Sequence, residues 1–176
     1  MRIETLPALL QDMDDEILFQ GLPGKSPAGF PSNDALLLEL RELLPEFKKK
    51  QKIKRPVILS YSLVTDGEMQ QLNRDYRGKD QTTDVLSFSQ VEGMDFPDTG
   101  PMPLGDIVIS RAQCIRQAQE KNHSPLHELR ILTIHGLYHL LGFDHKTSEE
   151  DALHMEKLER QLLNLFLKKK AASEPR

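Results

Sequence analysis

The amino-acid sequence predicts a single α+β domain, in which a small mixed β-sheet is packed by helices. Two observations support this fold class. Short segments rich in β-branched and apolar residues are interleaved with longer segments in which apolar residues recur at helical spacing. The length of 176 residues suits one domain with a substantial core and is too short to expect two.

The N-terminal part carries the weakest structural signal. Within residues 1–32, glycine and proline punctuate the segment GLPGKSPAGFPS, which favours a loop or linker. A short helix is expected over 35–44, because its leucines recur at helical spacing and Pro45 can close it. Its N-terminus has three candidate capping residues, Ser32, Asn33 and Asp34.

Three strands and one helix are expected between residues 56 and 110. The strand segments are PVILSYSLVTD at 56–66, TDVLSFSQ at 83–90 and LGDIVIS at 104–110. Asp66 is a plausible N-cap for a helix over GEMQQLNRDY, since Met69, Leu72 and Tyr76 fall on one helical stripe. The intervening segment VEGMDFPDTGPMP is rich in glycine and proline, so we expect an exposed loop there.

Three further helices are expected in the C-terminal part. The first follows the last strand through RAQCIRQAQEKN. The second begins at Ser124-Pro125, with proline at the first helical position, and runs through LHELRILTIHGLYHLL to Gly142. The third begins near Thr147 or Ser148, where acidic residues three positions later resemble a capping box, and continues through ALHMEKLERQLLNLFL.

The domain boundaries follow from these signals. Residues 1–50 are expected to form a poorly defined N-terminal extension and the first helix. Residues 51–167 are expected to form the domain that carries the chemistry. The last residues, KKKAASEPR at 168–176, are expected to be a flexible basic tail.

Composition excludes several classes of protein. Lys and Arg number 23 and Asp and Glu 27, so the net charge of −4 does not indicate a globally basic nucleic-acid binder, although a local patch can still bind RNA. The single cysteine excludes an internal disulfide framework and fits a reducing cytosol. The N-terminus is acidic where a signal peptide is basic, and no apolar run is long enough to span a bilayer. We expect a soluble, cytoplasmic protein with no membrane partner.

The segment HGLYHLLGFDH places His135, His139 and His145 at positions i, i+4 and i+10. Two histidines four residues apart project from the same face of a helix. Gly142 can end that helix through a left-handed cap and return the chain toward the pair. Three converging imidazoles suit one tetrahedral Zn²⁺ whose fourth position is left to water, which is the arrangement of catalytic zinc sites.

Two other interpretations of these histidines are weaker. Chance would give the triple spacing in on the order of one chain in a hundred. A structural zinc site normally closes with four ligands, often thiolates, whereas Cys114 lies well upstream with no partner cysteine. The other histidines have no partner at ligand spacing and are not expected to bind metal: His123, His127 and His154.

The histidine segment also matches the metzincin protease pattern H-E-x-x-H-x-x-G-x-x-H, which predicts a zincin-like metal helix. It departs from that pattern at Gly136, which takes the position of the general-base glutamate. Glycine has no side chain that can accept a proton, so a peptidase on a metzincin-like scaffold is disfavoured. Zinc lowers the pKa of a coordinated water to roughly 7 without that glutamate, so hydrolysis as such is not excluded.

The motifs together resemble those of the YbeY family of metal-dependent endoribonucleases. HGLYHLLGFDH resembles the family signature, LNRDYRGKDQTTDVLSF at 72–88 resembles a second family block, and LGDIVIS resembles a third. The similarity covers about Val57 to Leu163, with the motifs in family order. The first fifty or so residues add nothing to it.

This resemblance implies a single-strand-specific, zinc-dependent endoribonuclease that acts on ribosomal RNA in small-subunit maturation and ribosome quality control. It implies that His135, His139 and His145 hold the zinc and that Arg77 serves the reaction or holds RNA. A guanidinium suits that role because it can contact two phosphate oxygens at once. Asp144 can orient a ligand histidine or simply end a turn, and both alternatives stay open. The resemblance also implies the ribosome or its small subunit as partner.

Two further points stay open in the sequence. A non-catalytic ribosome-assembly or RNA-binding factor with a stabilising zinc is the alternative from a different functional class. A basic run is usually a solvated surface, but clustered cations can also neutralise RNA phosphates. The possible RNA contacts of this kind are Lys48, Lys49, Lys50, Lys52, Lys54 and Arg55.

Overall fold

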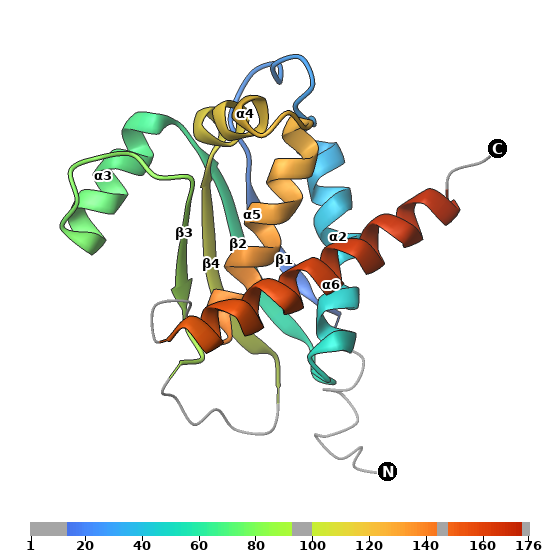
Figure 1. Ribbon diagram of the computed structural model, residues 1–176. Helices are drawn as coiled ribbons and strands as arrows, with labels where there is room; N and C mark the ends of the chain where they lie inside the picture. Colours follow the sequence, from blue (N-terminus) through green and yellow to red (C-terminus); the bar gives the residue numbers. More distant parts are fainter. Residues whose placement is uncertain (1–13, 93–99, 144–147, 174–176) are drawn as a thin grey trace, which may run out of the picture.

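Four strands form one mixed sheet in the order β1–β2–β4–β3, in a computed structural model that describes residues 14–92, 100–143 and 148–173 (Figure 1). The strands are β1 (Glu16–Gln20), β2 (Val57–Val64), β3 (Val85–Ser89) and β4 (Met102–Ser110). Strands β1 and β4 run parallel to β2, whereas β3 runs antiparallel to β4. The prediction of a small mixed sheet is confirmed, with the three expected strands as β2, β3 and β4.

The described part of the chain contains five helices that pack on this sheet and on one another. They are α2 (Asn33–Lys50), α3 (Asp66–Arg77), α4 (Arg111–Glu120), α5 (Pro125–Leu140) and α6 (Glu149–Ser173). Helices α2 and α5 cover one face of the sheet, and α6 crosses α5 on its outer side (Figure 1). Met69 of α3 packs with Leu86 of β3 and Val108 of β4. The predicted α+β class is therefore confirmed. None of the described helices combines the length and apolar content needed to cross a membrane.

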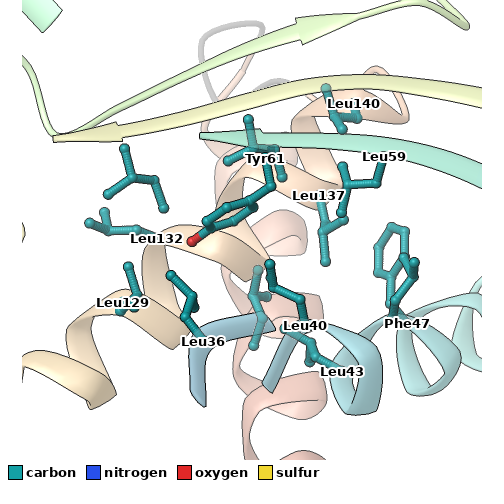
Figure 2. Close-up of a cluster of buried hydrophobic side chains, with 14 of the residues drawn as sticks. Leu36, Leu40, Leu43, Phe47, Leu59, Tyr61, Leu129, Leu132, Leu137 and Leu140 are labelled. Atoms are coloured by element: carbon teal, nitrogen blue, oxygen red, sulfur yellow. The ribbon is translucent and has the colours of Figure 1, made fainter. Parts of the chain in front are cut away.

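The core forms between β2, α2 and α5, where apolar residues recur at the period of each element. Alternate residues of β2 are buried, which directs Leu59 and Tyr61 toward the helices, as Figure 2 shows. Facing them are Leu36, Leu40, Leu43 and Phe47 of α2 and Leu129, Leu132, Leu137 and Leu140 of α5. Burying each of these side chains stabilises the fold by about 1.5–3 kcal/mol, so α5 is held rigidly against the sheet.

Hydrogen-bonding side chains fix where the helices begin. Thr65, and not the expected Asp66, caps α3: its hydroxyl accepts from the Glu68 N–H at 3.3 Å, and the Glu68 carboxylate accepts from the Thr65 N–H at 2.8 Å. Hydrogen bonds from the Thr65 N–H and the Thr65 hydroxyl to the carboxylate lower the pKa of Glu68. Ser124 caps α5 with proline in its first turn, as predicted.

Helix α2 does not end at Pro45, which corrects the prediction for this segment. The helix runs on to Lys50 with Pro45 inside it. Proline removes one backbone hydrogen bond and costs about 3 kcal/mol in a helix interior. The apolar stripe continues past it, however, and Phe47 is 0 % exposed. Burial of the last turn against the core outweighs the local preference of proline.

Strand β1 was not expected, because residues 1–32 carried the weakest structural signal and only GLPGKSPAGFPS within them was predicted, as loop or linker. Its five residues pair in parallel with β2 along one edge of the sheet, from Glu16↔Ile58 to Gln20↔Ser62. The Asp15 carboxylate fixes the start of the strand by accepting from the Val57 N–H at 3.0 Å and pairing with Lys48. A five-residue edge strand with polar ends gives too little periodicity to be recognised in sequence.

Helix α6 extends through Ser173, so the expected flexible tail from residue 168 is helical as far as the structure describes it. Ion pairs to α2 account for this extension. Lys169 pairs with Glu46 at 2.6 Å, and Lys170 pairs with Glu42 at 2.7 Å and with Glu39 at 2.9 Å. The partners come from a helix more than a hundred residues earlier, which the sequence pattern of the tail does not reveal.

Candidate metal centre

Helix α5 brings His135 and His139 together on the side that does not face the core. Their Nε2 atoms lie 3.0 Å apart, and their rings meet edge to face with centroids 4.4 Å apart. Both residues are half-buried, while Leu137 and Leu140 of the same helix point into the core. The i, i+4 spacing therefore places two imidazole nitrogens at one point of the surface, as the sequence predicts.

This separation fits the requirement of a shared cation. Two nitrogen ligands bound tetrahedrally at about 2.0–2.1 Å from zinc lie about 3.3 Å from each other. The observed Nε2–Nε2 distance of 3.0 Å needs only a small ring movement to match that value. Neutral imidazole is also a ligand type that zinc prefers. The two residues that the structure describes are thus compatible with zinc.

The third predicted ligand, His145, and the candidate Asp144 lie outside the described residues. Within 14–92, 100–143 and 148–173, no three His, Cys, Asp or Glu side chains gather in a group that could hold a metal ion. The assignment of His145 and Asp144 to the centre stays a prediction.

The end of α5 shows how the chain turns after the histidine pair. Gly142 has φ +83°, a left-handed conformation that favours glycine, and its N–H donates to the His139 carbonyl at 3.0 Å. Ser89 of β3 donates its hydroxyl to the Leu140 carbonyl at 2.8 Å, which ties the last turn of α5 to the sheet. The helix ends at Leu140, and Gly142, two residues later, takes the left-handed conformation expected there.

A carboxylate from α6 that was not predicted from the sequence contacts His135. Glu159 Oε1 lies 2.8 Å from His135 Nδ1, on the opposite side of the ring from Nε2. The two residues are 24 positions apart and meet only because α6 crosses α5. Spacing along the chain gives no signal for such a contact.

Gly136 has a structural reason to be glycine. A Cβ built on it would lie 3.0–3.2 Å from three side-chain carbons of Ile107 in β4, which is tighter than ordinary packing. This position of α5 therefore faces the sheet and allows close approach of helix and strand. A glutamate here would be directed into the core, so the metzincin general base has no place on this helix.

Arg77 is the last residue of α3 and is exposed. Its neighbour Tyr76 packs against Phe88 of β3, with ring centroids 5.0 Å apart, and Gly78 ends the helix with φ +67°. Among the described residues, the structure gives Arg77 no contact with His135 or His139. The role predicted for Arg77 therefore requires a substrate that extends from the histidines to α3.

The basic run from Lys48 to Arg55 divides into two groups. Three of its members are used within the fold: Lys48 pairs with Asp15, Lys50 donates to Gln161 at 2.9 Å, and Arg55 donates to the Gly100 carbonyl at 2.9 Å. The exposed members are Lys49, Lys52 and Lys54. This second group has the accessibility that a phosphate contact needs.

His123 and His127 form a separate group where α4 meets the first turn of α5. His123 contacts the fully buried carboxylate of Glu128, which Lys121 also pairs at 2.7 Å. His127 packs against the His123 ring, and burial lowers the pKa of His127. These contacts join α4 to α5, and they give the buried Glu128 carboxylate two polar partners, Lys121 and His123.

Two buried groups stay protonated at neutral pH, one on the helix that carries the centre and one where α4 meets the start of α5. Burial raises the pKa of the Tyr138 hydroxyl to about 12, and the Glu159 charge adds to that shift. Burial likewise raises the pKa of the Cys114 thiol to about 12. Neither group supplies a proton acceptor near neutral pH, so the chemistry of the site depends on its histidines and carboxylates.

Comparisons with a family model and with individual relatives return the same description. A family model described as Endoribonuclease YbeY matches residues 30–167. Endoribonuclease YbeY of Symbiobacterium thermophilum is 52% identical over 114 residues, covering 63% of this chain and 73% of that protein. Endoribonuclease YbeY of Bacillus velezensis is 41% identical over 129 residues, covering 68% and 79%. That of Bacillus subtilis is 34% identical over 143 residues, covering 76% and 88%.

A solved structure shares the fold. The solution structure of TM1509 from Thermotoga maritima superposes with a TM-score of 0.58 at 24% identity, covering 89% of this chain and 92% of that one. The family match starts at residue 30 and so includes α2, which the motif resemblance from about Val57 onward did not. Helix α2 contributes an apolar stripe and no chemical motif, which explains why resemblance by motif stopped short of it.

Proposed function

The chain belongs to the endoribonuclease YbeY family and is a nuclease hydrolase, and from this we propose a zinc-dependent endoribonuclease that cuts single-stranded ribosomal RNA precursors. The biological role that we propose is maturation of small-subunit ribosomal RNA and ribosome quality control in the cytoplasm. The ribosome or its small subunit is the proposed partner. These finer points rest on the resemblance of the motifs to those of the family.

The convergence of His135 and His139 carries the proposal of metal-dependent chemistry. Their Nε2 atoms, 3.0 Å apart, form half of a tetrahedral donor set. The left-handed cap at Gly142 turns the chain just before the segment that contains His145, our proposed third ligand. When bound, zinc would supply Lewis acidity and activate water for attack on phosphorus.

The remaining residues act on the RNA backbone. Arg77 would stabilise the negative charge that grows on the phosphate as the bond to the leaving oxygen breaks, by bidentate hydrogen bonds. The exposed Lys49, Lys52 and Lys54 would hold other phosphates without reading sequence. A peptidase is disfavoured because Gly136 faces Ile107 and leaves no position for the glutamate base.

The experiment that tests this proposal compares substrates and charge-reversed variants. Zinc-loaded wild-type protein is incubated with a single-stranded RNA and, separately, with casein. We expect cleavage of the RNA only. Arg77→Glu is expected to lower kcat/KM for RNA by about 100-fold or more, the effect of losing one donor to a developing charge. Its zinc content should be unchanged. The matched control is Lys79→Glu, an exposed cation two residues on, for which we expect less than about a fivefold change.

The outcomes separate the competing functions. Digestion of casein would favour a peptidase. Intact RNA after incubation with the zinc-loaded protein would favour a non-catalytic assembly or RNA-binding factor. RNA cleavage at the wild-type rate by Arg77→Glu would remove Arg77 from the mechanism and leave the nuclease activity standing.

A further inference from the structure

Glu159 contacts the one nitrogen of His135 that a metal would not use. Its carboxylate oxygen lies 2.8 Å from Nδ1, and both side chains are largely shielded from water, at 23 % and 29 % exposure. A carboxylate can only accept a hydrogen bond, so Nδ1 carries the proton in this contact. The lone pair of the neutral ring is then on Nε2, the atom that faces His139.

The crossing of α6 over α5 fixes where Glu159 sits. The hydroxyl of Tyr138, on α5, donates to the carbonyl of Leu158 at 3.3 Å, one residue before Glu159. Gln51 donates to the same hydroxyl at 3.2 Å, and the Tyr138 ring packs edge-on against Phe47. The carboxylate is therefore delivered by a buried junction and not by a freely moving surface side chain.

The surroundings strengthen the contact. A groove between α5 and α6 runs beside Glu159 and is lined on its apolar side by Ile131, Ile134 and Leu163. Apolar neighbours exclude water from one side of the carboxylate and increase the energy of the hydrogen bonds that it accepts. Glu156 lines the same groove one turn earlier on α6.

We propose that Glu159 is a positioning residue of the metal centre, which holds His135 in the tautomer and orientation that bind a divalent cation. Metal-ligating histidines are commonly held in this way, and the carboxylate also makes the ring a better donor. Helix α6 thereby becomes part of the centre although it supplies no ligand. The inference rests on the proposed function in one respect, that His135 binds the cation.

The test is zinc affinity, measured by competition with a chromophoric chelator on the full chain. Loss of such a partner typically weakens metal binding about 10- to 100-fold, so we expect a decrease of this size for Glu159→Ala. Glu159→Gln keeps a neutral acceptor of the same shape and should recover part of the loss. The matched control is Glu156→Gln, which changes the same charge in the same groove without touching His135 and should stay within about twofold.

A second measurement distinguishes positioning from ligation and from folding. Cobalt-substituted Glu159→Ala should keep the visible absorption bands of the wild type, because the ligand set is unchanged. Thermal unfolding of the metal-free Glu159→Gln and Glu156→Gln variants should agree. If the alanine variant does not fold, the zinc affinity of the glutamine variant decides. Glutamine has the same shape as glutamate and can pack in its place without the charge.

Failure of this proposal is distinguishable from failure of the proposed function. Wild-type zinc affinity in both Glu159 variants, together with loss of zinc from His139→Ala, would overturn the role of Glu159 and leave the metal site intact. Full zinc binding by His139→Ala would instead overturn the metal site itself. A changed cobalt spectrum in Glu159→Ala would make Glu159 a ligand and would also contradict the proposal.

Discussion

His139→Ala is expected to remove bound zinc and to lower the rate of RNA cleavage by about a thousandfold or more, equivalent to about 4 kcal/mol of transition-state stabilisation. The His139 Nε2 atom lies 3.0 Å from that of His135, and loss of either ring would leave the proposed site with two histidines. Two ligands do not retain zinc against dialysis as three do. Elemental analysis after dialysis and single-turnover cleavage of a single-stranded RNA measure the two effects.

The control for this variant is His127→Ala, about three turns earlier on α5, where the side chain packs against His123 and not against the pair. It should keep both zinc and activity. Circular dichroism should show the same helix content in both variants, because neither side chain belongs to the apolar core. A His139→Ala protein with full zinc content and full cleavage would contradict the assignment of the metal centre.

Gly105→Ala is expected to destabilise the fold by about 4 kcal/mol, a large share of the 5–15 kcal/mol that stabilises a typical domain. Gly105 in β4 has φ +128°, and a Cβ there would lie 2.1 Å from the carbonyl oxygen of Phe88 in β3. Backbone strain costs about 1–3 kcal/mol and overpacking about as much again. Relief would require β3 to move away from β4. Urea unfolding followed by circular dichroism measures the change.

Gly67→Ala is the matched control for this change. Gly67 lies in the first turn of α3 with no atom within 4 Å of the added Cβ, so alanine should stabilise the protein by up to about 1 kcal/mol. An equal effect of the two substitutions would show that the approach of β3 to β4 is not as close as the structure has it. Because β3 also holds the end of α5 through Ser89, Gly105→Ala should weaken zinc binding in the fraction that remains folded.

The elements that could be predicted from sequence are those whose signal is local. Strand β2 alternates buried and half-exposed residues, and α5 begins with a serine cap and proline and is followed by the left-handed Gly142. The predicted spacing of His135 and His139 on that helix is confirmed as a close pair of rings. In each case the residues that determine the structure are neighbours along the chain or one helical turn apart.

The features that could not be predicted depend on distant packing. Pro45 remains inside α2 because Phe47 is buried against the core, and the end of α6 is helical because Lys169 and Lys170 pair with α2. Glu159 reaches His135 only through the crossing of two helices. Gly136 shows the same dependence, since its contact with Ile107 comes from a strand about thirty residues away.

Removal of the metal tests most directly the claim that the histidine centre holds the cation on which RNA cleavage depends. The purified protein is treated with a chelator, its zinc content is measured by elemental analysis, and cleavage of a single-stranded RNA is followed while zinc is added back. We predict that cleavage is lost with the metal and returns in proportion to added zinc, reaching its maximum at about one zinc per chain. Cleavage at the untreated rate by protein without measurable metal would contradict the account.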